Sequence, residues 1–189
     1  MKTLADAWSW YQSTRSNLLR MQRLASHHWD DPSLENSSLS QDEKFKTLEA
    51  EEIEEETTQA LNPLDDLAVL VLFSVFEATV REYLELRIQP EASILSEPIL
   101  KHAAQEAIVG VREGSFFNRV LNPLKQQGQV SSELIDKVNQ VRTYRNWVAH
   151  GKRKARKKGE FNIKPQEAYD RLKGFLDTLS IVVEPEIGS

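Results

Sequence analysis

Cysteine is absent from the 189 residues of this chain. Its absence excludes disulfide bonds, cysteine-based zinc sites and thiol nucleophiles. Glycine and proline number only seven each, too few for a collagen-like or low-complexity chain, and the chain is 40% hydrophobic and 28% charged, as folded proteins are. At about 150 residues per domain, this length predicts one domain with extensions.

Long apolar runs are also lacking. The longest, Leu67–Phe76, is interrupted by Ser74 and is far shorter than the roughly 20 residues that span a bilayer. Near the N-terminus, Asp6 stands where a signal peptide would need a continuous apolar core. We therefore expect a soluble cytoplasmic protein without a membrane partner.

The net charge of −5 conceals two opposite poles. Six of the seven residues in 152–158, the basic strip, are lysine or arginine, whereas residues 41–56 hold eight acids and two lysines. A basic strip is typical of phosphate binding, and an acidic run repels phosphate.

Helical periodicity is present almost throughout, without alternating β-branched runs between hairpin turns. We predict an all-α protein, an up-and-down bundle of four to six helices. The expected helices cover residues 3–28, 64–88, 97–109, 115–124, 131–150 and a last segment from 165 to just before Pro185. Residues 1–62 would form a first helix and an acidic arm, either a solvated helix or a mobile segment. Residues 63–184 would form the main domain, in one globular unit with the first helix.

The helix of residues 64–88 is predicted to be central. Pro63 suits a helix start, and Pro90 should end the helix soon after residue 88. Apolar residues cover all sides of Leu67–Phe76, which indicates a helix surrounded by neighbours.

One charged side chain breaks the pattern of the helix at 131–150. At about 100° per residue, Arg145 falls in the middle of an apolar stripe formed by Leu134, Val138, Val141 and Val148. A guanidinium there requires a carboxylate, an anionic ligand or a water-filled groove at an interface. A structural ion pair or a side chain that reaches out to solvent is the simpler alternative.

His150 follows Arg145 by five residues and immediately precedes Gly151, a typical residue for a helix end. This spacing separates the two side chains by about 140° on an ideal helix. They converge only if the helix ends there or if two copies of the chain face each other. An anion-binding arginine, a histidine and the basic strip together indicate phosphate chemistry.

The segment Arg145-Asn146-Trp147-Val148-Ala149-His150 resembles the Arg-x(4-6)-His motif of the HEPN superfamily, including the polar residue after the arginine. The helix around Glu77, from Phe73 to Leu84, resembles the early core helix of several HEPN branches, and the resemblance spans about residues 64–183. It implies a helical bundle that forms a homodimer through the motif helix. Many members are metal-independent endoribonucleases, including toxins of toxin–antitoxin pairs and prokaryotic defence proteins, so no cofactor is expected.

The resemblance assigns catalysis to Arg145 and His150. Histidine can serve as acid or base, and an arginine can donate two hydrogen bonds to phosphoryl oxygens while the RNA 2′-hydroxyl attacks. The expected products carry a 2′,3′-cyclic phosphate and a 5′-hydroxyl, and DNA should resist. Asn146 would be a supporting hydrogen-bond donor. Glu77 would support the site by approaching Arg145, with a local pair to Arg81 as the alternative.

The basic strip would bind the RNA backbone with little sequence preference. Its candidate RNA-binding residues are Lys152, Arg153, Lys154, Arg156, Lys157 and Lys158. A plain surface loop is the alternative. Glu49–Glu56 of the acidic arm could also cover the strip as a competitor for nucleic acid.

No metal site is expected. His27 and His28 lie near Asp30 and Asp31, but adjacent histidines on a helix point about 100° apart and no third ligand is spaced to join them. Three functions remain open: the HEPN ribonuclease, a non-catalytic HEPN-like module that binds RNA or protein, and an antitoxin-like scaffold whose acidic arm binds a basic partner. A cognate antitoxin or a neighbouring regulatory protein is a possible partner of the first.

Overall fold

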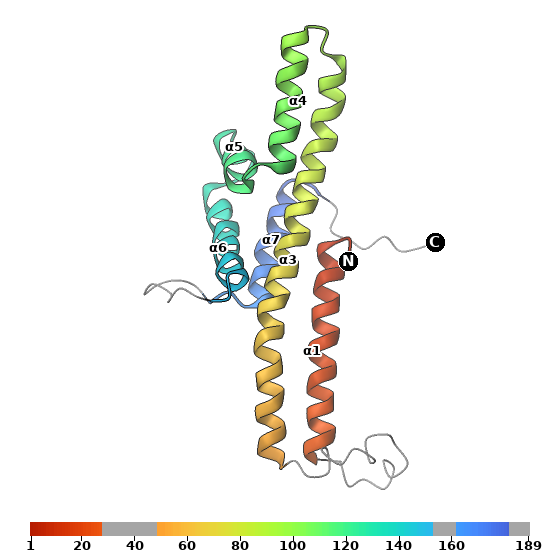
Figure 1. Cartoon of the computed structure of the whole chain (residues 1–189), viewed down its shortest axis with the longest axis vertical. Coiled ribbons are helices and arrows are strands. Elements are labelled where there is room, and N and C mark those ends of the chain that lie inside the picture. The colour runs from red at the N-terminus through yellow and green to blue at the C-terminus, as the bar shows by residue number, and fades with distance from the viewer. Residues whose placement is uncertain (28–48, 153–161, 182–189) are drawn as a thin grey trace, which may run out of the picture. The chain divides into compact units, whose positions relative to one another are not determined.

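The computed structural model describes residues 1–27, 49–152 and 162–181, and in these ranges the chain is helical and contains no strand. The all-α prediction is therefore confirmed. The elements, labelled in Figure 1 where there is room, are α1 (Leu4–His27), α3 (Ala50–Ile94), α4 (Pro98–Glu113), the π-helical turn η3 (Phe117–Leu121), α5 (Asn122–Gln126), α6 (Ser132–Ala149) and α7 (Pro165–Thr178). Two compact units divide the chain, one of Met1–Trp8 with Ala68–Ser189 and one of Ser9–Leu67, so α1 and α3 contribute to both.

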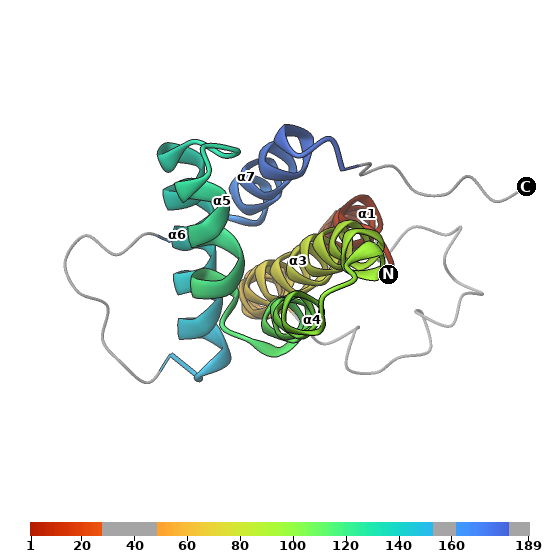
Figure 2. The same ribbon diagram turned by 90° about the horizontal axis from the view of Figure 1, so that it is seen from above.

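The core of the larger unit is built on one stripe of α3. Five of its side chains, which share one face at the i, i+3, i+4 and i+7 spacing of a helix, are completely buried: Val69, Leu72, Phe73, Phe76 and Val80. Helices α6 and α7 lie side by side (Figure 2) and add buried side chains such as Val138 and Leu172. The prediction of a central helix is confirmed for this part of α3.

Phenylalanine rings connect the elements of this core. The Phe76 ring meets Phe116 and Phe175 edge to face, with ring centres 5.8 and 5.2 Å apart. Phe73 meets Phe116 in the same way at 6.0 Å. Such pairs stabilise a core beyond their buried area, so α3, α7 and the segment before η3 are held together at one point.

Helix α3 is longer than predicted, because it continues through both prolines that were expected to bound it. Each proline removes one backbone donor and disfavours a helix interior. Pro63 and Pro90 are both exposed, so water can bind the carbonyls that they leave unpaired. Burial of Ile53 and Ala92 beyond the two prolines stabilises the extended ends of the helix.

Other boundaries also differ from the predictions. Helix α4 continues past Gly110 to Glu113, and a π-helical turn and α5 replace the single helix expected at 115–124, with Pro123 in the first turn of α5. Helix α7 ends at Thr178, earlier than expected. The expectation that neighbours surround Leu67–Phe76 is wrong on one side, since Leu67 is 46% exposed and Ser74 is exposed.

The smaller unit pairs Ser9–His27 of α1 with Ala50–Leu67 of α3, seen as neighbouring helices in Figure 1. Its buried side chains include Tyr11, Ala25, Ile53 and Leu64. The glutamates at 51, 52, 54, 55 and 56 are all exposed, so this part of the acidic arm is a solvated helix. Residues 41–48 lie outside the described ranges.

A tyrosine–carboxylate pair joins the two helices of the smaller unit. The Tyr11 hydroxyl donates to Asp65 Oδ1 at 2.7 Å. Burial, and then the hydrogen bond to Asp65, raise the pKa of Tyr11. The folded chain therefore keeps this proton at pH values where an unfolded tyrosine, with a pKa of about 10, loses it.

We expect Tyr11→Phe to lower the free energy of unfolding by about 1 kcal/mol at neutral pH, because one partly buried hydrogen bond is lost. The stability that comes from the raised pKa is present below pH 10 or so and declines as the pH rises further. Denaturant unfolding at pH 7 and pH 11 should show a smaller difference between wild type and variant at the higher pH. An undiminished difference would contradict this assignment.

None of the helices in the described part of the chain combines the length and the apolar character needed to cross a membrane.

Candidate functional site

Helix α6 begins and ends where the sequence predicts. The Ser131 hydroxyl accepts a hydrogen bond from the Leu134 N–H at 3.2 Å and caps the helix. At the other end His150 is the capping residue, and Gly151 has a φ of 67°, the left-handed backbone that glycine adopts most readily. The Gly151 N–H donates to the Val148 carbonyl at 2.9 Å, which closes the last turn.

Arg145 lies on the face of α6 that packs against α3. Its guanidinium carbon is 4.7 Å from the centre of the Phe73 ring, and its Nη2 donates to Glu77 Oε2 at 2.8 Å. Its Nη1 donates to Asn146 Oδ1 at 3.1 Å. The side chain remains 27% exposed. Glu77 is therefore the carboxylate that pairs with Arg145, and the side chain stays partly exposed although its Nε is buried.

Glu77 serves two arginines at once. Its Oε2 accepts from Arg145, whereas its Oε1 accepts from Arg81 Nη2 at 2.6 Å and from Arg81 Nε at 3.1 Å. Both pairings left open by the sequence are therefore present. The two ion pairs fix the direction of the carboxylate, which in turn fixes Arg145.

Arg81 also anchors this cluster to the end of α4. Its Nη2 donates to the Gly114 carbonyl at 3.0 Å and its Nη1 donates to the carbonyls of Val111 and Arg112. A cation stabilises the carbonyl end of a helix, where the dipole is negative. Sequence reasoning missed this contact because it ended that helix near Val109 and had no means of pairing it with α3.

His150 is exposed at the end of α6. Its backbone N–H donates to the Asn146 carbonyl at 3.0 Å. Its imidazole forms no hydrogen bond with any residue in the described ranges. The ring is therefore open to solvent at the helix end.

The basic strip is described only at its first residue. Lys152 is exposed, and its Nζ lies 5.4 Å from the centre of the Trp147 ring. The other predicted RNA-binding residues, Arg153, Lys154, Arg156, Lys157 and Lys158, lie outside the described ranges, and so does the predicted contact between the strip and the acidic arm.

Arg142 is a charged residue near the site that sequence reasoning did not single out. Its Nε donates to Asn139 Oδ1 at 2.9 Å, and its guanidinium lies 5.2 Å from the centre of the Phe117 ring. Burial, and then the charge of Arg145, lower the pKa of Arg142, and Glu77 opposes that shift. The available signal was its position three residues before Arg145, which places both on neighbouring parts of the helix surface.

Within the described ranges, no three histidine or acidic side chains are grouped so that they could hold a metal ion. His28, Asp30 and Asp31, the weak candidate from the sequence, lie outside those ranges.

No family model, curated protein or solved structure matches this chain. The resemblance to the HEPN superfamily therefore stays a prediction that rests on the residues of α3 and α6.

Proposed function

We propose that this protein is a metal-independent endoribonuclease of the HEPN type that cleaves RNA by attack of the 2′-hydroxyl. One observation carries the proposal: Arg145 is fixed by Glu77 and Phe73 yet 27% exposed, and the helix that bears it ends at the exposed His150. A positioned guanidinium followed by an accessible imidazole is the pair that phosphodiester cleavage needs.

The reaction requires one base, one acid and neutralisation of the phosphate. A base takes the proton of the 2′-hydroxyl as its oxygen attacks phosphorus, and an acid protonates the departing 5′-oxygen. Imidazole serves both roles near neutral pH. Arg145 donates hydrogen bonds to the phosphoryl oxygens as negative charge grows on them. The products are a 2′,3′-cyclic phosphate and a 5′-hydroxyl.

A homodimer formed through α6 is part of this proposal. On one helix Arg145 and His150 point in different directions, and two copies that face each other bring two arginines and two histidines to one place. Asn146, which already accepts from Arg145, would act as a supporting donor through its amide nitrogen. Lys152 and the rest of the basic strip would bind the RNA backbone.

We place this activity in the cytoplasm, in a prokaryotic toxin–antitoxin or defence system, with a cognate antitoxin or neighbouring regulatory protein as a partner. This context follows from the resemblance of Arg145–His150 to the HEPN motif. Unrestrained cleavage of RNA harms the cell that makes the enzyme, so such an enzyme needs a restraining partner.

A second candidate function is a non-catalytic HEPN-like module that binds RNA or a protein partner. The ion pair with Glu77 favours it, because part of the Arg145 guanidinium is already bonded within the chain. Such a module would keep the binding surface and lack cleavage.

The test is incubation of the full chain with end-labelled RNA in EDTA. We expect the wild type to cut the RNA and leave cyclic phosphate and 5′-hydroxyl ends, while His150→Ala is inactive because no imidazole remains to move the proton. An all-DNA oligonucleotide of the same sequence should stay intact, since it has no 2′-hydroxyl.

His102→Ala is the matched control, because His102 is an exposed histidine on α4. It should cleave like the wild type. Equal cleavage by His150→Ala would remove His150 from the chemistry. Intact RNA that binds the wild type with salt-sensitive affinity would favour the binding module.

A further inference from the structure

The cluster around Glu77 holds more positive than negative charge. Two arginines pair with its carboxylate, and a third, Arg142, lies close enough for both Glu77 and Arg145 to influence its pKa. Each guanidinium lies over a phenylalanine ring: Arg81 over Phe116 at 5.2 Å, Arg142 over Phe117 at 5.2 Å and Arg145 over Phe73 at 4.7 Å. One carboxylate therefore pairs with two guanidiniums, and the third, Arg142, has no carboxylate partner in the described part of the chain.

Arg142 has the fewest partners of the three. Arg81 donates to Glu77 and to three backbone carbonyls. In the described part of the chain, Arg142 donates only from Nε, to Asn139, and it pairs with no carboxylate. Arg145 Nε, in contrast, is buried without a hydrogen-bond partner. Among the described residues, nothing therefore occupies the terminal nitrogens of Arg142, which leaves them available to a ligand.

Arg142 and Arg145 are like charges three residues apart on α6, and of these two only Arg145 pairs with Glu77. Burial weakens their solvation, and their mutual repulsion adds to that cost. A second anion beside Arg142 would offset the repulsion that remains. A planar guanidinium donates two parallel hydrogen bonds to phosphate oxygens and stacks on aromatic rings, which a lysine ammonium does less well. This arrangement fits a phosphoryl group.

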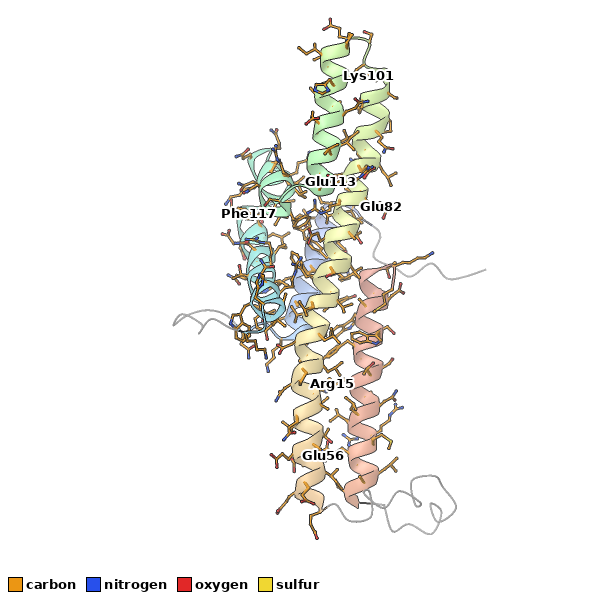
Figure 3. The ribbon with its side chains drawn as sticks, in the orientation of Figure 1. Arg15, Glu56, Glu82, Lys101, Glu113 and Phe117 are labelled. Carbon is orange, nitrogen blue, oxygen red and sulfur yellow. The ribbon has the colours of Figure 1, made fainter. Side chains whose placement is uncertain are left out.

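We propose that Arg142 is a further RNA-binding residue, whose terminal nitrogens donate to a backbone phosphate beside the one that Arg145 contacts. This inference rests on the proposed function. Arg142 lies outside the Arg145–His150 motif, and the ring that supports it comes from η3, where Phe117 is labelled in Figure 3. The π-helical turn therefore positions an anion-binding residue of α6.

The test measures binding without cleavage. The probe is a fluorescein-labelled 2′-O-methyl RNA oligonucleotide, which lacks the attacking hydroxyl, and fluorescence anisotropy gives its affinity for the full chain at several salt concentrations. We expect Arg142→Gln to weaken binding about 10-fold. The slope of the logarithm of the association constant against the logarithm of the salt concentration should become shallower by about 1, the value for one lost phosphate contact.

Lys137→Gln is the matched control. It removes the same charge from the same helix, at an exposed lysine that pairs with Glu133, and it should leave affinity and slope close to wild type. Arg142→Lys tests the geometry, since it keeps the charge and loses the planar guanidinium with its two parallel hydrogen-bond donors. It should show intermediate affinity with the wild-type slope.

Each outcome decides the inference. If Arg142→Gln binds like Lys137→Gln while the wild type cleaves RNA, the role of Arg142 is refuted and the proposed function stands. If the wild type neither binds the probe nor cleaves RNA, the proposed function fails and this inference fails with it. Weak binding by Arg142→Gln counts as support only if its circular dichroism melting curve matches the wild type.

Discussion

Arg145→Ala should reduce the rate of RNA cleavage at least about 100-fold, the usual cost of removing a positioned donor to a developing oxyanion. The chain should remain folded, because Glu77 keeps its ion pair with Arg81 at 2.6 Å and is not left as an unpaired charge. The measurement is the rate of cleavage of a defined RNA in EDTA, with folding checked by circular dichroism and association by light scattering.

Arg171→Ala is the matched control for this variant. Arg171 is also partly buried and ion-paired, but its partners are Glu167 and Gln140, on α7 and α6. Its loss should lower stability and leave the cleavage rate nearly unchanged. If Arg145→Ala cleaves as fast as Arg171→Ala, then Arg145 is a structural ion-pair residue and the proposed mechanism is wrong.

Glu77→Gln should lower the free energy of unfolding by about 2 kcal/mol, because it removes the only carboxylate that pairs with Arg81 and Arg145 in the described ranges. All three side chains are no more than 27% exposed, so water compensates only in part. For a chain of this size, we expect a melting temperature lower by about 6 °C.

Glu85→Gln provides the comparison on the same helix. Glu85 pairs with Arg112, but the Arg112 side chain is 55% exposed, and exposed ion pairs add little to stability. Its melting temperature should therefore fall less than that of Glu77→Gln. Equal shifts in the two variants would show that the Glu77 cluster has no special role in stability.

Much of the candidate site could be predicted from local sequence signals. Ser131 and Gly151 bound α6 because a cap and a left-handed residue act within one helical turn. Arg145 stood out because helical spacing alone places it among apolar residues. The same reasoning predicts that it needs a carboxylate, an anionic ligand or a water-filled groove, and Glu77 is the candidate carboxylate, with Arg81 as its alternative partner.

The prolines show where local signals fail. Pro63 and Pro90 each predict a helix boundary, because proline disfavours a helix interior. In the structure, burial of Ile53 and Ala92 beyond them stabilises one helix from Ala50 to Ile94. Packing can outweigh local propensity when the two differ by only a few kcal/mol.

Local sequence patterns were enough to predict the all-α class, the bounds of α6 and the anomaly at Arg145, because helical period and caps depend on residues close together in the chain. Three contacts came from the folded structure instead: Glu77 bonds to both arginines, Arg81 binds the end of α4, and Arg142 lies over Phe117. Each of these contacts depends on which helices pack together. The packing of the helices is set by the free energy of the whole fold and not by that of any one segment.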